Sequence, residues 1–255
     1  MAFSSDFYIH GASWLHRLDP RVKLLMTGAL MITAFRMSTL LPVIVLLAFI
    51  HLLLLSARIP KSKFIWVWKM MLPITIMIGI LWPFFYHEGT PLFEFGIIRI
   101  TVGGILRGAA MALRICILAF ACFILLFSTD QAKIVRALVK LGVPYRVGLM
   151  LAITLRYIPT FFGIITMVTD AQKARGLNLD TGSPVKKLKA YMPILAAVLI
   201  TGLKTSDSLS NALETRAFSA SVKHRTYYRD IAMRPADYVL MCGIVLSTVV
   251  ILRAW

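Results

Sequence analysis

Acidic residues are scarce in this chain of 255 residues, which has 11 Asp and Glu against 28 Lys and Arg and a formal net charge of +17. Only 15% of the residues are charged, whereas 59% are hydrophobic and the mean hydropathy is +0.80. Soluble domains are about 45–50% apolar, so we predict an integral membrane protein. In such a protein a basic excess indicates cytoplasmic loops facing anionic lipid, and we expect no nucleic-acid partner.

Patterns that support catalysis or ion coupling are also missing. No GxxxxGK[ST] loop is present, so the chain lacks the cradle that holds nucleotide phosphates, and any ATPase must be a separate chain. No acid lies at the centre of a proposed span, where proton- or sodium-coupled carriers usually place one. The sequence therefore predicts no catalytic residue, no enzyme activity and no cofactor bound by this chain.

Cysteine and histidine are few and scattered. The three cysteines lie in apolar runs without CxxC spacing, which is typical of small core residues: Cys116, Cys122 and Cys242. The five histidines lack HExxH or paired spacing, so we interpret them as interfacial or loop residues and predict no metal site: His10, His16, His51, His87 and His224. The first apolar run follows three basic residues without a small-residue cleavage site, so no cleavable signal is expected.

Long apolar runs are abundant. Asp19-Pro20 has the N-cap and first-turn proline of a helix start. Five spans are predicted, at 22–36, 39–55, 70–86, 101–127 and 237–254, with a tight turn at 36–38, a basic connector at 58–69 and a loop at 87–99.

The distribution of Lys and Arg orients these spans. Three lie between the N-terminus and Lys23, four in the 58–69 connector and sixteen in 128–236, whereas the opposite side has only Arg36, Arg99 and Arg253. The positive-inside rule then places the N-terminus in the cytoplasm and the C-terminus outside.

Two further apolar stretches, 147–169 and 191–203, leave an alternative open. If both crossed the bilayer, the chain would be a stand-alone channel or secondary carrier with seven spans. Arg156 would then lie near the bilayer centre at a cost of about 2.5–3.5 kcal/mol, and the second stretch has only thirteen residues. A short external loop would also hold five basic residues: Lys173, Arg175, Lys186, Lys187 and Lys189.

We therefore favour a cytoplasmic domain of three helices that lies against the membrane. The first begins at Asp130 and ends at Gly142 and Pro144, the second covers about 146–175, and the third about 184–217. The predicted fold is an all-α integral membrane protein with about five transmembrane helices and a cytoplasmic domain of three helices, two of them long. Its predicted parts are residues 1–127, 128–236 and 237–255.

Both long helices end in a similar way. "DAQKARG" (170–176) and "SNALETRAF" (210–218) place Ala171 in register with Ala212, and Arg175 with Arg216. An arginine in a last helical turn is favoured by the helix dipole, which is the simpler explanation for either one. Two such arginines at the ends of two apolar helices favour a docking role, because a guanidinium can grip carboxylates or carbonyls of a partner.

Four segments resemble the transmembrane T component of energy-coupling factor (ECF) transporters, which are ATP-driven importers of micronutrients such as vitamins or transition metals. They are "LHRLDPRVKLL" (15–25), "ALVKLGVPYRVGLMLAITLRYIP" (137–159), "DAQKARG" (170–176) and "ALETRAF" (212–218). The resemblance implies a scaffold in a bacterial or archaeal plasma membrane. The implied partners are two cytoplasmic ABC-type ATPases, which bind ATP and Mg, and one membrane-embedded substrate-binding S component.

The resemblance also implies that the two long helices cross. In that family two Ala-Arg-Gly motifs end two long crossing coupling helices, and each motif docks on one ATPase. Ala174, Arg175 and Gly176 match the motif in full, whereas Thr215, Arg216 and Ala217 keep only the arginine. The sequence leaves four points open. It does not show whether the second motif docks in the same way or which substrate is imported. Nor does it show how many S components are served or whether the two ATPases are identical.

The fourth predicted span has two further features. Arg114 lies near its middle, and we interpret it as a structural arginine bonded to carbonyls of a neighbouring helix or to the cytoplasmic domain at 128–236. Gly104, Gly108 and Ala112 form a small-xxx-small seam, which serves either internal packing or the S component.

Overall fold

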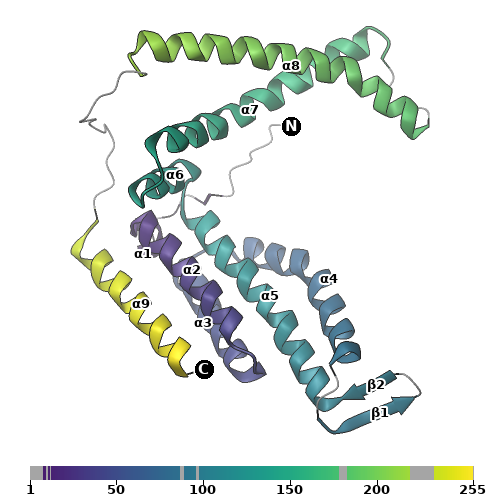
Figure 1. The fold of residues 1–255 in the computed structure, drawn as a ribbon, viewed down its shortest axis with the longest axis vertical. Helices are drawn as coiled ribbons and strands as arrows, with labels where there is room; N and C mark the ends of the chain where they lie inside the picture. Colours follow the sequence, from purple (N-terminus) through teal and green to yellow (C-terminus); the bar gives the residue numbers. More distant parts are fainter. Residues whose placement is uncertain are drawn as a thin grey trace. The chain divides into compact units, whose positions relative to one another are not determined.

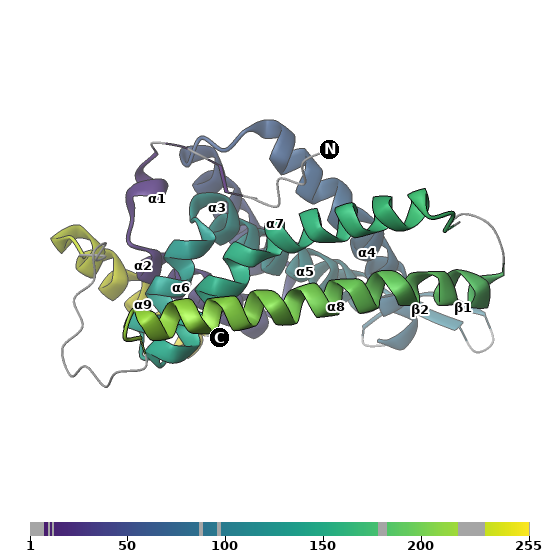
Figure 2. The same ribbon diagram turned by 90° about the horizontal axis from the view of Figure 1, so that it is seen from above.

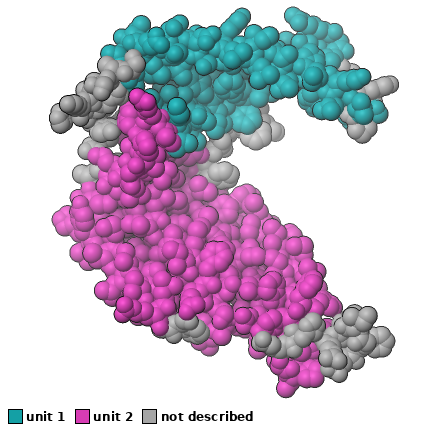
Figure 3. Space-filling view, viewed as in Figure 1, with its two compact units in different colours: residues 1–5, 149–230 teal, residues 6–148, 231–255 magenta. Residues whose placement is uncertain are grey.

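The computed structural model describes residues 8–9, 11, 13–86, 89–95, 98–177, 183–218 and 233–254. Helices dominate it, as predicted for an all-α membrane protein (Figure 1). Packing divides the chain into two compact units: residues 6–148 with 231–255, and residues 149–230 with 1–5 (Figure 3).

The larger unit is built around one helix, α5 (Val102–Ser128), against which α2 (Pro20–Arg36), α3 (Leu40–Ser56) and α4 (Lys61–Phe85) pack. Its buried face carries Ile117, Phe120, Ile124 and Phe127. The remaining elements of this unit are α1 (Trp14–Arg17), β1 (Pro91–Phe95), β2 (Ile98–Thr101), α6 (Gln131–Lys140) and α9 (Pro235–Ala254), the last packed on α2.

Polar caps begin the helices where the sequence predicts them. The Asp19 carboxylate accepts the Arg21 amide at 2.9 Å at the start of α2, and the Asp130 carboxylate accepts the Ala132 amide at 3.2 Å at the start of α6. At the start of α5, Thr101 Oγ1 accepts the Gly104 amide at 3.1 Å. Each cap satisfies an amide that has no partner inside its helix.

The predicted connector at 58–69 is wrong in part, because α4 already begins at Lys61. Lysine is a good helix former and keeps its amino group in water while its stem covers apolar surface, so a hydropathy window underestimates this helix. Pro73 lies inside α4 and removes one backbone donor, and Figure 1 shows the helix bending along its length.

The predicted loop at 87–99 contains a hairpin instead. Strands β1 and β2 pair antiparallel, with Glu94 opposite Arg99 and Phe95 opposite Ile98. The strands have only five and four residues, and β1 places Leu92 next to Phe93, so apolar and polar residues do not alternate regularly enough to predict a strand.

His51 is not a loop residue, because it lies in α3, five residues before the end of the helix, among three aromatic rings: Phe64, Trp68 and Phe120. Its Nδ1 lies 2.7 Å from Leu47 O, and Trp68 Nε1 donates to its Nε2 at 3.2 Å. Since a carbonyl only accepts and an indole only donates, Nδ1 acts as the donor and Nε2 as the acceptor in these two hydrogen bonds.

The smaller unit consists of α7 (Tyr145–Ala174) from residue 149 onward and α8 (Pro184–Thr215). Packing therefore divides the chain differently from the boundary predicted at residue 128, because α6 belongs to the larger unit. This short amphipathic helix buries Val135 and Ala137 and packs on α2.

Length and composition select five described helices that are apolar enough to cross a bilayer, but not the predicted five. They are α4, α5, α7, α8 and α9. Helices α2 and α3 have 17 residues each, which is about 25 Å and the lower limit for a span. Hydropathy thus leaves open whether α7 and α8 cross, and the cytoplasmic placement of these helices stays a prediction.

A lysine is buried where α1, α2 and α5 meet. Lys23 is 1% exposed, and its Nζ donates to Ser128 O at 2.9 Å and to His16 O at 3.4 Å. Burial, with Lys23 and Lys133 nearby, lowers the pKa of His16, so its ring is neutral at pH 7. Ser128 ends α5, where the helix dipole favours a cation.

Replacing this lysine should weaken the larger unit. We expect Lys23→Met to lower the free energy of unfolding by about 1–3 kcal/mol, because it leaves a buried carbonyl without its donor. Thermal and chemical unfolding of the detergent-solubilised chain measure the change. Lys133→Met, on the exposed side of α6, is the matched control and should have little effect. Equal effects of the two substitutions would contradict this role for Lys23.

Candidate functional site

The end of α7 is a Schellman motif in which Arg175, directly after the last helical residue, is the C-cap. Gly176 has a left-handed φ of 87°, its amide donates to Lys173 O at 2.9 Å, and the Leu177 amide donates to Gln172 O at 3.0 Å. Glycine suits this position because it lacks the Cβ that makes left-handed backbone costly. The stop that the sequence predicts at Gly176 is confirmed.

The end of α8 has the same backbone geometry although it lacks the glycine. Ala217 has a φ of 55°, its amide donates to Glu214 O at 2.9 Å, and the Phe218 amide donates to Leu213 O at 3.0 Å. Each bond repeats one at the end of α7, displaced by 41 positions. The sequence left this geometry open, and the structure shows that Arg216 and Arg175 occupy equivalent positions in equivalent motifs.

Both arginines are exposed. Among the described residues, no carboxylate lies within ion-pair distance of either guanidinium. Each is thus held by a rigid helix end while its five donors face outward, an arrangement that can grip carboxylates or carbonyls of another chain. Ala174 and Thr215 end their helices one residue earlier and are exposed as well.

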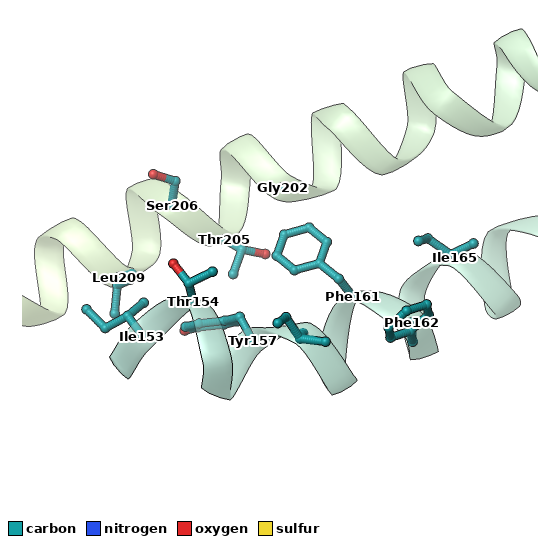
Figure 4. A pocket seen from close by; sticks show the side chains of 11 residues that line it. Ile153, Thr154, Tyr157, Phe161, Phe162, Ile165, Gly202, Thr205, Ser206 and Leu209 are labelled. Carbon is teal, nitrogen blue, oxygen red and sulfur yellow. The ribbon is translucent and has the colours of Figure 1, made fainter. Parts of the chain in front are cut away.

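Helices α7 and α8 run antiparallel and cross (Figures 1 and 2). At the crossing, the Phe161 ring lies over Gly202, as the close view in Figure 4 shows, and a Cβ at Gly202 would lie 3.3 Å from Phe161 Cε1. The crossing leaves a mostly apolar groove of about 580 Å³, to which α8 adds Thr205, Ser206 and Leu209.

The contact between Phe161 and Gly202 lies at the same distance along the chain from each of the two arginines. Arg175 follows Phe161 by fourteen positions, and Arg216 follows Gly202 by fourteen. At 1.5 Å per residue, each arginine lies about 21 Å along its helix from the crossing, in opposite directions. The pair therefore presents two like ends with approximate twofold symmetry. Sequence reasoning missed Gly202, whose only signal was a glycine inside a helical run.

The seam of α5 packs inside the larger unit. A Cβ at Gly104 would lie 2.5 Å from Tyr86 O, and one at Gly108 would lie 3.3 Å from Gly79 O. Ala112 is also buried and faces Gly79. All three thus lie against α4 or the turn after it, where small side chains allow close helix contact.

The guanidinium of Arg114 is held within the larger unit. It donates from one nitrogen to Met37 O, in the turn between α2 and α3, and from another to Met111 Sδ at 3.2 Å. A carbonyl at the end of a neighbouring helix suits a structural arginine, because the helix dipole is negative there. No group of three metal-ligating side chains occurs among the residues described.

Comparisons with known proteins place this architecture in a class. The family of the cobalt transport protein CbiQ matches residues 11–228. The energy-coupling factor transporter transmembrane protein EcfT of Listeria innocua is 32% identical over 245 residues, covering 93% of this chain and 92% of the relative. The EcfT proteins of Streptococcus equi and Ruminiclostridium cellulolyticum are 32% and 30% identical, covering 94% and 93% of this chain and 91% of each relative.

The long apolar helices and these matches define a multi-pass membrane protein of the transport class. More closely, the chain belongs to the CbiQ family and is the transmembrane T component of an energy-coupling factor transporter.

The alanine at the end of α8 gives a test of the shared motif. We expect Ala217→Gly to stabilise this helix end by about 1 kcal/mol, because left-handed backbone costs a residue with a Cβ about 1–2 kcal/mol. Slower hydrogen exchange of amides in the last turns of α8 would show it.

The matched control is Ala212→Gly, five positions earlier inside α8. Glycine in a helix interior costs about 1 kcal/mol relative to alanine, so this substitution should accelerate exchange. If Ala217→Gly also accelerates exchange, the left-handed conformation of Ala217 is refuted.

Proposed function

We propose that this chain is the non-catalytic scaffold of an importer and transmits the motion of two ABC-type ATPase chains to a separate S component in the membrane. The observation that carries the proposal is the pair of equivalent arginine-bearing helix ends, equidistant from the crossing of α7 and α8. Two like ends suit two like ATPase subunits, in accord with the twofold symmetry common in protein assemblies.

Each ATPase would hold one end. Arg175 with its neighbours Ala174 and Gly176 would dock on one subunit, and Arg216 with Thr215 and Ala217 on the other. The chain has no GxxxxGK[ST] loop of its own, so ATP and Mg would bind to the partner chains. When the ATPases close on ATP, the two ends are drawn together and the helices turn about Phe161 and Gly202.

The S component would rest on the apolar surface of the same two helices. Side chains of α7 and α8 are almost all unburied within the described structure, although both helices are strongly apolar. A partner that slides over such a surface exchanges one packed arrangement for another as the helices turn. The S component would also choose the substrate, a micronutrient such as a vitamin or a transition metal.

The charge distribution supports an orientation in which the ends of α7 and α8 face the cytoplasm, where the ATPases would bind them. Sixteen of the 28 basic residues lie between residues 128 and 236, so the positive-inside rule places that region in the cytoplasm, where ATP is. In this orientation the N-terminus is inside and the C-terminus outside the bacterial plasma membrane.

A second candidate is a stand-alone channel or carrier in which α7 and α8 cross the bilayer. The observation in its favour is their length of 30 and 32 residues together with an apolar composition that qualifies both as spans. The basic residues in and around the segment that joins them, among them Lys173 and Lys187, argue against it.

Charge reversal tests the docking arginines. We expect Arg175→Glu or Arg216→Glu to weaken co-purification with the ATPases and the double substitution to abolish it, because a carboxylate would repel the acceptors that a guanidinium grips. Arg→Lys at both sites should restore only part of the binding, since lysine lacks the planar fork.

Lys173→Glu and Lys189→Glu are matched controls, because both lysines are exposed and the substitutions make the same charge change on α7 and α8 outside the docking triplets 174–176 and 215–217. Undiminished assembly of the double arginine variant would refute the docking role. Equal losses in the lysine variants would assign binding to net charge instead.

Cysteine labelling separates the two candidate functions. Ser183→Cys, in a chain whose three natural cysteines are replaced, places one thiol at the exposed start of α8. An impermeant maleimide added to intact cells should leave it unlabelled and react only after permeabilisation. Labelling from outside would establish the seven-span carrier topology.

A further inference from the structure

Two cavities of the larger unit adjoin at Trp14, and neither belongs to the helix ends described above. The first is an apolar groove of about 560 Å³ formed by α2, α3 and α9. The second, of about 520 Å³, lies between α1 and the end of α3 and is more polar. Trp14 lines both, and its indole Nε1 donates to Ser56 Oγ at 2.6 Å, which fixes the boundary between them.

The polar cavity is chemically suited to an anion. Arg17 and Arg58 line it together with the hydroxyls of Ser13 and Ser56, and none of its lining residues is acidic. Both arginines are exposed, so their donors are accessible to a ligand. Two guanidinium groups match the several acceptor oxygens of a phosphate group. The Ser13 hydroxyl is already engaged with His16 Nδ1 at 2.6 Å, whereas Ser56 Oγ accepts the Trp14 indole and keeps its own proton to donate.

The backbone at Arg58 points to the same site. Arg58 has a left-handed φ of 52°, and the turn closes through the Arg58 amide to Leu55 O at 3.0 Å and the Ile59 amide to Leu54 O at 3.5 Å. Glycine would suit this position better, since it adopts left-handed backbone without strain. An arginine here keeps a charged side chain at the cavity at the expense of local stability.

The length and the apolar lining of the groove suit an alkyl chain. Its lining runs along α3 from Leu41 to Leu53, about 18 Å at 1.5 Å per residue. One leaflet of a bilayer core is about 15 Å thick, so the groove accommodates one acyl chain of one leaflet.

We propose that these cavities form a binding site for one anionic phospholipid. One acyl chain occupies the groove between α3 and α9, and the phosphate lies against Arg17 and Arg58. Trp14 sits at the boundary between headgroup and hydrocarbon, the depth that tryptophan prefers. The site depends on α2 and α3 lying in the bilayer and not on the ATPase docking proposed above.

Lipid retention by the full-length chain tests the site. The purified, delipidated protein is incubated with detergent micelles containing equal amounts of phosphatidylglycerol and phosphatidylcholine with identical acyl chains, and bound lipid is quantified by mass spectrometry. The wild-type chain should retain about one phosphatidylglycerol per chain and prefer it roughly tenfold over phosphatidylcholine, because only its headgroup is a net anion.

Two variants separate the headgroup from the acyl contact. Arg17→Gln with Arg58→Gly should abolish the roughly tenfold preference and leave phosphatidylcholine retention unchanged, and the glycine suits the left-handed turn, so folding is preserved. Ser247→Phe, which fills the groove from α9, should reduce retention of both lipids. Thermal unfolding checks that each variant is folded.

Arg253→Gln is the matched control, because Arg253 lies in the last turn of α9, at the end of the groove away from Arg17 and Arg58. It should leave the retention of both lipids and the preference for phosphatidylglycerol unchanged. If it removes the preference, the headgroup lies at the opposite mouth and the proposal is wrong. Displacement of phosphatidylglycerol by millimolar inorganic phosphate would show an anion site without an acyl contact. A wild-type chain that retains neither lipid would leave the groove to a partner protein and overturn the proposal.

Discussion

The buried amino group of Lys23 is the constraint on which the larger unit depends. It reaches the last carbonyl of α5 and a carbonyl of α1, so one cation joins the chain before the first long helix to the end of the central one. A charge removed from water is tolerated only where its donors are matched by acceptors, and here the helix dipole of α5 supplies a second stabilising contribution. Two residues further on, Asp130 caps α6, so the junction fixes where that helix begins.

A second polar contact extends this junction to the last helix. Asp237 is 3% exposed, and its two carboxylate oxygens accept the Arg234 amide at 2.8 Å and the Asp19 amide at 3.4 Å. The carboxylate thus caps the start of α9 and also binds the residue that caps α2. The N-terminal ends of α2 and α9 therefore lie side by side, although 218 positions separate Asp19 and Asp237. This explains why α9 packs on α2.

The sequence predicted those features that depend on local chemistry. Asp19, Asp130 and Gly176 marked helix ends correctly, because a cap acts through the few residues beside it. The pairing of β1 with β2, the early start of α4 and the placement of His51 among aromatic rings were not predicted, since hydropathy windows register neither pairing nor packing. At the candidate site, the register of Arg175 with Arg216 was visible in the sequence. The left-handed Ala217 was not, because alanine rarely adopts that backbone and tertiary context overrides the preference.

The unequal helix lengths of the larger unit have a consequence for the surrounding lipid. The α2–α3 pair has 17 residues per helix, whereas α4 and α5 have 25 and 27, and Arg114 in the middle of α5 already bonds to the turn that ends α2. In the predicted topology, α2 and α3 would present about 25 Å of helix to a hydrocarbon core of about 30 Å, whereas α4 and α5 are nearly 40 Å long. Such a hydrophobic mismatch would be relieved by thinning of the bilayer beside α2 and α3 and by tilting of the longer helices. The protein would then lie across a gradient of membrane thickness of its own making.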